Sequence, residues 1–212
     1  ITNELANRNI TANINEMYIG TFHSLCLRII KDNLEFTQLK KNYRLLDSFD
    51  QKYLVFRNIQ KFRNIADIEL VMPNGGAWKW AEAICGLVGT LTEELVDADA
   101  MAKDSKTEIR VLSAILKQYQ QLLTDENLID FAKIQTECYR LLKENPAILS
   151  DLQEKIHYLM IDEYQDTNYI QEQIIFMLGE KHGNICVVGD DDQGKSEGQA
   201  VLGRQTSVTT PW

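Results

Sequence analysis

Residues 157–168 read His-Tyr-Leu-Met-Ile-Asp-Glu-Tyr-Gln-Asp-Thr-Asn, and this stretch decides the fold. Its first five residues are mostly apolar and contain neither Gly nor Pro, which predicts a buried strand of a parallel sheet. Asp162 and Glu163 follow directly, at the carboxyl end where open α/β sheets collect their ligands. One carboxylate there can hold Mg²⁺ and a second can take a proton from an attacking water. Paired acids can also cap the next helix, so the pair alone leaves both roles open.

The residues after the acidic pair narrow this choice. Asp162 to Asn168 resembles the Asp-Glu-x-Gln-Asp-Thr-Asn sequence of the UvrD/PcrA/Rep-type superfamily 1 DNA helicases. In that family the acidic strand end is the Walker B element of a nucleotide hydrolase. The resemblance implies that Asp162 binds Mg²⁺ and that Glu163 contacts ATP and activates water. It also implies that Gln165 links the nucleotide state to the grip on DNA.

A second predicted strand follows this segment. Apolar residues between Ile170 and Leu178 have helical spacing, and residues 184–188 form another apolar run, which predicts a βαβ crossover with two buried parallel strands. The run continues into Gly-Asp-Asp-Asp-Gln at 189–193, which resembles the Val-Val-Gly-Asp-Asp-Asp-Gln sequence of the same helicases. The resemblance implies that Gln193 senses the γ-phosphate of ATP and takes part in catalysis.

Residues 17–30 predict a short strand, a turn at Gly20 and a helix capped by Thr21. Gly-Thr-Phe-His-Ser at 20–24 is similar to the helicase sequence that contacts single-stranded DNA from the first RecA-like core domain. The resemblance implies that Thr21, Phe22 and His23 touch the strand. Without the resemblance, a capped helix with a satisfied surface histidine explains the same residues.

The segment between these motifs is helical in character. Ser48 and Gln51 predict a capping box, and residues 112–123 carry an apolar stripe with helical spacing. Asp130 is the predicted N-cap of the helix that leads back towards the acidic strand, and Pro146 is predicted to open the next helix. The resemblance to the helicases implies an α/β fold class: a RecA-like P-loop NTPase parallel sheet with an inserted all-helical subdomain. Its parts are residues 1–44 and 128–193 for the core, 45–127 for the insertion, and 194–212 for an atypical tail.

Charge is distributed unevenly along the chain. The net charge is −9, which is unusual for a DNA-binding protein. Residues 28–63 nevertheless carry nine basic and four acidic side chains, a local +5, so the remainder carries −14. Such a cluster is either a solvated face or a surface that follows phosphates, and the sequence leaves both open.

Composition predicts a globular protein, since 44% of its 212 residues are hydrophobic. No apolar run reaches 18 residues and the first residues do not resemble a signal peptide, so we expect a cytoplasmic protein without membrane contact. The four cysteines are far apart and form no Cys-x-x-Cys pair, which predicts reduced, buried thiols.

The chain departs from the helicase pattern at both ends. It has no Gly-x-x-Gly-x-Gly-Lys-Thr segment before Gly20, and the family's Ser-Ile-Tyr does not follow Gln193. Residues 189–196 match G-x-x-x-x-G-K-[ST], but three carboxylates in that loop oppose an anion, so we do not expect a phosphate cradle. We therefore expect a helicase fragment with a foreign or frameshifted tail.

The resemblance implies a parent protein that uses ATP and Mg²⁺ to translocate on single-stranded DNA and to unwind duplex junctions, with 3′→5′ polarity. The isolated chain is expected to be inactive, because the phosphate-binding lysine and the second core domain are missing. The alternative is a helicase-like module that binds DNA or protein without turnover. The intact Asp162–Glu163 pair favours catalysis in the parent protein.

Overall fold

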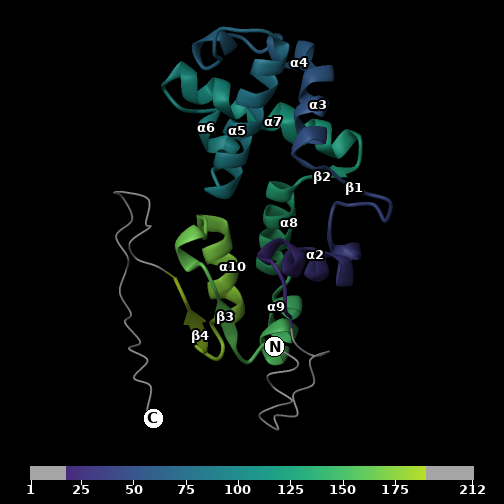
Figure 1. Cartoon of the computed structure of the whole chain (residues 1–212), viewed down its shortest axis with the longest axis vertical. Helices are drawn as coiled ribbons and strands as arrows, with labels where there is room; N and C mark the ends of the chain where they lie inside the picture. Colours follow the sequence, from purple (N-terminus) through teal and green to yellow (C-terminus); the bar gives the residue numbers. More distant parts are fainter. Residues whose placement is uncertain (1–17, 190–212) are drawn as a thin grey trace.

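The computed structural model describes residues 18–189 (Figure 1). Its elements are, in chain order, α2 (Phe22–Asp32), η2 (Leu34–Phe36), β1 (Arg44–Leu45), α3 (Ser48–Arg57), α4 (Ile59–Arg63), η3 (Ile68–Leu70), α5 (Ala77–Glu93), α6 (Ala98–Met101), α7 (Thr107–Asp125), β2 (Leu128–Ile129), α8 (Phe131–Glu144), α9 (Pro146–Lys155), β3 (Leu159–Ile161), η4 (Tyr164–Asp166), α10 (Tyr169–Gly179) and β4 (Ile185–Val187). No helix among these is long and apolar enough to cross a membrane.

The described residues form two hydrophobic cores. One is built by α3, α4, α5 and α7, and the other by α2, α8, α9 and α10. The short parallel pair β1–β2 lies between them. The two side chains of β2 point to different cores: Leu128 packs into the first and Ile129 into the second. This division follows from strand geometry, because successive side chains point to opposite faces.

Between the two strands of this pair, the structure has helices joined by turns and loops, and no strand. The buried face of α7 carries Val111, Ile115, Leu116, Tyr119, Leu122 and Leu123, as its apolar stripe predicts. Strand β1 ends at Leu45, so the expected boundary of the inserted subdomain at residue 45 falls inside a strand. The parts 1–44, 45–127, 128–193 and 194–212 remain a proposal about domain organisation.

The second core positions the two predicted site segments. Helix α8 packs against α2 on one side and against α10 on the other (Figure 1). Strands β3 and β4 pair in parallel, with Leu159 opposite Ile185 and Ile161 opposite Val187, and α10 connects them. The predicted βαβ unit is therefore confirmed, because parallel neighbours require such a crossover.

The expected burial of these two strands is wrong. Met160 is 80% exposed and Val187 is 49% exposed, and no residue of β3 or β4 is fully buried. The reason is that helices cover only one face of the two-stranded sheet among the described residues. Cys186 of β4 is exposed as well, so the expectation of buried thiols is wrong for this cysteine and confirmed for the other three. The expected strand before Gly20 is also not present at Tyr18 and Ile19, and Met17 lies outside the described residues.

Helix starts follow the sequence in most places. Thr21 and Asp130 cap α2 and α8, and Pro146 opens α9. The expected capping box of Ser48 and Gln51 is wrong, because the carboxylate of Asp47 accepts the backbone N–H bonds at the start of α3. An aspartate one residue earlier competes for the same amides and leaves the Gln51 side chain available for another partner.

Candidate functional site

The acidic pair lies at the carboxyl end of β3, beside the end of β4. Pairing continues past the strands, since the Val188 amide donates to the Ile161 carbonyl (2.8 Å) and the Tyr164 amide donates to the Val188 carbonyl (2.9 Å). Asp162 and Glu163 are both exposed at this edge. The backbone thus places the carboxylates where open α/β sheets bind ligands.

Glu163 has a left-handed backbone conformation, with φ 52° and ψ 43°. A non-glycine residue in this region costs about 1–3 kcal/mol and is held there by its surroundings. The Glu163 amide donates to Oδ1 of Asp162 (3.0 Å), and Nε2 of Gln165 donates to Oε2 of Glu163. Hydrogen bonds therefore join Asp162, Glu163 and Gln165, the three residues predicted to act at the nucleotide, in one short loop.

Gly189 explains how closely β4 approaches this loop. A Cβ atom at position 189 would lie 2.5 Å from Oε1 of Gln165 and 3.3 Å from the backbone nitrogen of Tyr164. A side chain at this position would displace the carboxamide of Gln165 and shift the loop backbone slightly, so glycine suits this close approach. Gln193, the other residue predicted to contact ATP, lies outside the described residues.

The loop is also anchored to α10. The hydroxyl of Tyr164 donates to Oε1 of Glu172 at 2.8 Å, and Asn168 forms a capping box with Gln171. Burial, followed by the Glu172 contact, raises the pKa of Tyr164 to about 12, so the phenol keeps its proton. The helix start after the acidic pair therefore has its own cap, and Asp162 and Glu163 are not needed for it.

The donor set fits a magnesium ion that reaches the protein together with a phosphate. No group of three or more His, Cys, Asp or Glu side chains within residues 18–189 could hold a metal by itself. Proteins that bind Mg²⁺ with nucleotide use one or two carboxylates, and phosphate oxygens and water complete the shell. Asp162 and Glu163 supply that number of carboxylates, both accessible to solvent.

The second predicted site begins helix α2. The Thr21 side chain accepts from the Ser24 amide at 3.3 Å, and Phe22 is half-buried against the second core. Thr21 is exposed and His23 is half-buried. The structure therefore leaves the Thr21 hydroxyl accessible at a helix N-terminus, where N–H groups attract anions.

Two residues that the sequence did not single out hold His23. Nε2 of Gln135 lies 2.7 Å from Nε2 of His23, and the Phe131 ring meets the imidazole edge-on at 5.3 Å. Burial lowers the pKa of His23, and the more distant charge of Glu93 acts in the opposite direction. No local pattern could reveal the Gln135 contact, because 112 residues separate the two partners.

No hydrogen bond or ion pair described for residues 18–189 joins the acidic pair to Thr21–His23. The two segments are instead related through α8, which contacts both α2 and α10. The structure therefore brings together Asp162, Glu163 and Gln165 as one group and Thr21, Phe22 and His23 as another.

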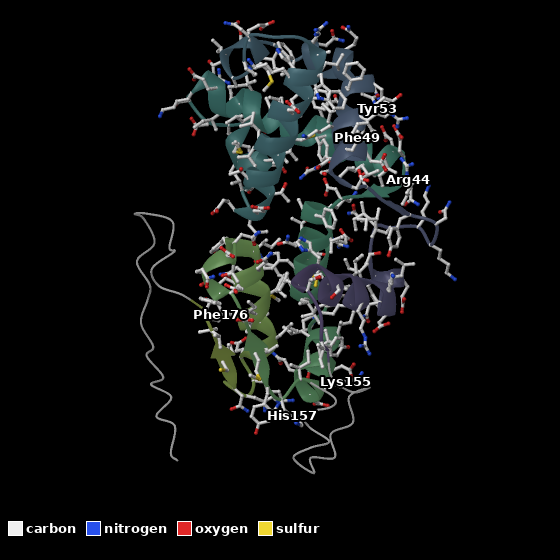
Figure 2. All side chains as sticks on the ribbon, in the orientation of Figure 1. Arg44, Phe49, Tyr53, Lys155, His157 and Phe176 are labelled. Carbon is white, nitrogen blue, oxygen red and sulfur yellow. The ribbon has the colours of Figure 1, made fainter. Side chains whose placement is uncertain are left out.

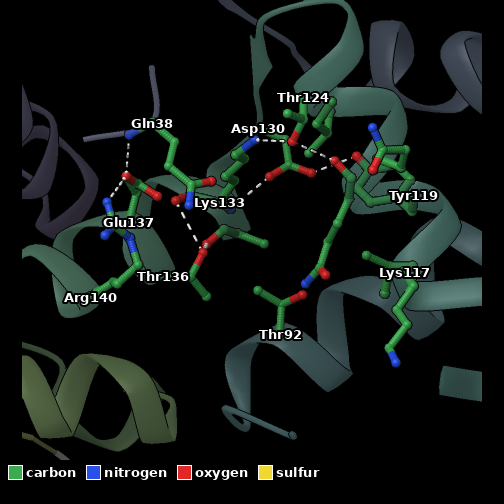
Figure 3. Close-up of a pocket in the computed structure, with 15 residues that line it drawn as sticks. Gln38, Thr92, Lys117, Tyr119, Thr124, Asp130, Lys133, Thr136, Glu137 and Arg140 are labelled. Atoms are coloured by element: carbon green, nitrogen blue, oxygen red, sulfur yellow. Dashed lines mark hydrogen bonds and ion pairs between the residues drawn. The ribbon is translucent and has the colours of Figure 1, made fainter. Parts of the chain in front are cut away.

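A polar cavity of about 550 Å³ lies near the junction of the two cores, lined by residues of α5, α7 and α8 (Figure 3). Asp130, 2% exposed, forms a network at its wall: Oδ2 accepts from the Tyr119 hydroxyl (2.5 Å) and from Nε2 of Gln51 (2.9 Å). Its Oδ1 caps α8 through the Lys133 amide (2.7 Å). The cavity lining includes none of the predicted site residues. We assign this network a structural role.

A parallel βαβ unit with two adjacent, exposed carboxylates at the carboxyl end of its first strand defines an α/β protein with an acidic edge where such sheets bind ligands. The comparisons with known proteins narrow this class. Residues 1–194 match the family described as the UvrD/REP helicase N-terminal domain. The chain belongs to this family, and a RecA-like fold follows from that membership.

Individual relatives agree with the family. ATP-dependent DNA helicase PcrA of Bacillus subtilis (strain 168) is 31% identical over 179 residues, which are 84% of this chain and 23% of that protein. PcrA of Staphylococcus aureus (strain Mu50 / ATCC 700699) is 30% identical, with the same coverage of 84% and 23%. A probable DNA helicase II homolog of Rickettsia felis is 33% identical over 90% of this chain and 28% of its own length. The chain spans about a quarter of the length of these relatives.

Proposed function

We propose that these residues are part of an ATP-dependent DNA helicase that couples ATP hydrolysis to movement along single-stranded DNA. The observation that carries the proposal is the loop in which Asp162, Glu163 and Gln165 contact one another at the carboxyl end of β3. Similarity to proteins named ATP-dependent DNA helicases over most of the chain supports it. A 3′→5′ direction, unwinding at duplex junctions and a cytoplasmic location belong to the same proposal.

Each residue of the loop has a role in this proposal. Asp162 holds Mg²⁺, which would supply charge neutralisation at the phosphates of ATP. Glu163 accepts a proton from water, and its exposed carboxylate at the strand end supports this role. Gln165 donates to that carboxylate and so can transmit its state. Gln193 completes the proposed ATP contacts.

The DNA side of the proposal uses Thr21, Phe22 and His23. The exposed hydroxyl at the start of α2 suits a phosphate, and the half-buried imidazole suits a sugar or base. Gln135 keeps the imidazole in one orientation, which lowers the entropy lost when the strand binds. Helix α8, which carries Gln135 and also packs on α10, is a physical connection between the two sites.

The catalytic assignment is tested in the full-length protein by Glu163→Gln. Removal of a general base typically lowers a rate about 10²–10⁴-fold, so DNA-stimulated hydrolysis should fall by that amount while DNA affinity is kept. Asp166→Asn, at another exposed acid of the same loop, is the matched control and should keep most of the activity. Equal losses in the two variants would show that Glu163 has no special role.

The DNA assignment is tested with the 212-residue chain and a labelled single-stranded oligonucleotide at several salt concentrations. Weak binding with a shallow salt dependence is expected, because the local +5 of residues 28–63 attracts phosphates while the rest of the chain carries −14. His23→Ala and the double change Lys40→Glu/Lys41→Glu should weaken it further. Tight binding at physiological salt that these substitutions do not weaken would show that the DNA binds another face of the protein.

The alternative, a helicase-like module that binds DNA or protein without turnover, predicts a different result for the same full-length protein. It should show no hydrolysis above background, with or without Glu163→Gln, whether its ligand is single-stranded DNA or a protein. Measured turnover therefore separates the two functions directly.

A further inference from the structure

An exposed row of aromatic side chains lies on the outer surface of the first core, far along the chain from the acidic pair. Its members are Phe49, Tyr53 and Phe56 of α3 and Trp78 of α5, which are 62%, 50%, 38% and 37% exposed. Large aromatic side chains are normally well buried, and a contiguous exposed group of them marks an interaction surface.

The rings form a continuous surface. Phe49 and Tyr53 stack with centroids 6.4 Å apart and an interplanar angle of 4°, and Tyr53 and Phe56 stack at 6.4 Å and 24°. Trp78 approaches Phe49 at 5.9 Å and Phe56 at 5.5 Å. Figure 2 shows Phe49 and Tyr53 at the outer edge of the molecule. The aromatic row is therefore already assembled before any partner binds.

The core does not require this row. Positions 49, 53 and 56 share one face of α3 because they are spaced by four and three residues. Leu54 and Val55 form the opposite, buried face, at 2% and 0% exposure. Since α3 already has an apolar face inside, the second apolar face on its outer side needs another explanation.

The chain segment that carries α3 is rich in basic side chains, which favours an anionic partner. Residues 40–63 contain seven basic and two acidic side chains within a chain of net charge −9. On α3, Lys52 pairs with Glu82 at 3.4 Å and Arg57 pairs with Glu126, and all four side chains are at least 37% exposed. Exposed pairs of this kind are worth only about 0–1 kcal/mol, so both cations remain available to phosphates.

We propose that the aromatic row is a stacking platform for the bases of single-stranded DNA, with Lys52 and Arg57 beside it as phosphate contacts. The proposal rests on the proposed DNA-binding function and adds a second contact surface, separate from Thr21–His23. Every base has a π-face, so such a platform binds without sequence preference. A single strand fits better than a duplex, because paired bases keep their faces stacked on each other.

The test compares two oligonucleotides of equal length, oligo(dT) and an abasic strand with the same phosphates. The full chain is titrated with each at low salt, as wild type and as Phe49→Leu/Tyr53→Leu, which keeps apolar volume and removes the rings. Stacking contributes about 1–3 kcal/mol per base, so the double variant should bind oligo(dT) at least about ten-fold more weakly. Its affinity for the abasic strand should not change.

Phe176→Leu is the matched control, because this aromatic side chain on α10 is 50% exposed and lies outside the row. It should leave both affinities unchanged. Thermal unfolding of the double variant checks that the fold is kept, as expected for exposed positions. Equal affinity of the wild-type chain for the two oligonucleotides, or an unchanged affinity of the double variant for oligo(dT), overturns the proposal and points to a protein partner for the row.

The design separates this proposal from the proposed function. Binding that is lost in His23→Ala but unaffected by the leucine substitutions would retain the DNA-binding function and reject the platform. Binding unaffected by both changes would reject the platform together with the assignment of Thr21–His23.

Discussion

Replacing Asp130 by Ala should destabilise the chain far more than removal of an ordinary helix cap. Asp130 is 2% exposed. Its carboxylate accepts three hydrogen bonds, from the backbone N–H of Lys133, the hydroxyl of Tyr119 and the side-chain amide of Gln51. These donors belong to α8, α7 and α3, so one side chain connects both hydrophobic cores. The substitution therefore tests whether the junction of the two cores depends on this carboxylate.

The expected magnitude follows from the separate contributions. Loss of an N-cap costs about 1 kcal/mol. The Tyr119 hydroxyl belongs to a side chain that is 1% exposed, and leaving it without a partner costs about 1–3 kcal/mol more. Gln51 is half-buried and can reach water, so it adds little. The total of about 2–4 kcal/mol is a large part of the 5–15 kcal/mol that typically stabilises a domain.

Asp47→Ala is the matched control, because Asp47 caps α3 with bonds of 2.9 and 2.7 Å but is exposed. It should cost only the cap, about 1 kcal/mol. Urea unfolding followed by circular dichroism and by tryptophan fluorescence measures both. With a slope of about 2 kcal/mol per molar urea, the midpoint should fall by about 1–2 M for Asp130→Ala and by about 0.5 M for Asp47→Ala.

Tyr119→Phe and Asp130→Ala together form a double-mutant cycle. In the Asp130→Ala background, Tyr119→Phe removes the orphaned hydroxyl, so the double variant should be less destabilised than the sum of the two single changes. Equal midpoint shifts for Asp130→Ala and Asp47→Ala, together with additive costs in the cycle, would refute the argument that the buried bonds at Asp130 join the cores.

Three further outcomes are expected. The purified 212-residue chain should hydrolyse ATP only at background rate, because its residues include no Gly-x-x-Gly-x-Gly-Lys-Thr segment; DNA-stimulated turnover that Glu163→Gln abolishes would contradict this. Burial lowers the pKa of His23 below its ordinary 6.5, so the unfolded chain binds the proton more readily. The free energy of unfolding should therefore fall as the pH drops below about 6.5. Urea midpoints measured at about pH 7.5 and about pH 5.5 should differ less for His23→Gln than for the wild-type chain. An equal difference in both would show that His23 does not cause the pH dependence. A maleimide should label exposed Cys186 rapidly and the buried thiols slowly, since burial raises the pKa of Cys85 to about 12, and equal rates for all four would contradict the packing.

Much of the local structure was predictable because it depends on neighbours in the chain. Thr21 and Asp130 cap helices through amides three residues away, and Pro146 fits the first turn of α9. The βαβ unit follows from two apolar runs around one amphipathic segment. The acidic loop was predictable for the same reason, since Asp162, Glu163 and Gln165 are close in sequence as well as in space.

The expectations that failed concern environment. The apolar runs at β3 and β4 predict burial, but an apolar strand becomes buried only when other elements cover both of its faces, and here one face remains exposed. Ser48 and Gln51 have the spacing of a capping box, yet Asp47 competes for the same amides. A local pattern states which partners are possible, and competition among them decides the outcome.

The sequence by itself therefore determined the family, most of the long helices and the loop that carries the two carboxylates. Only the tertiary structure paired Gln51 with Asp130, 79 residues later, and His23 with Gln135, 112 residues later. It also assembled Trp78 with the aromatic face of α3. These contacts depend on how helices pack against one another, and the free energy of that packing is summed over both cores, so no short segment encodes it.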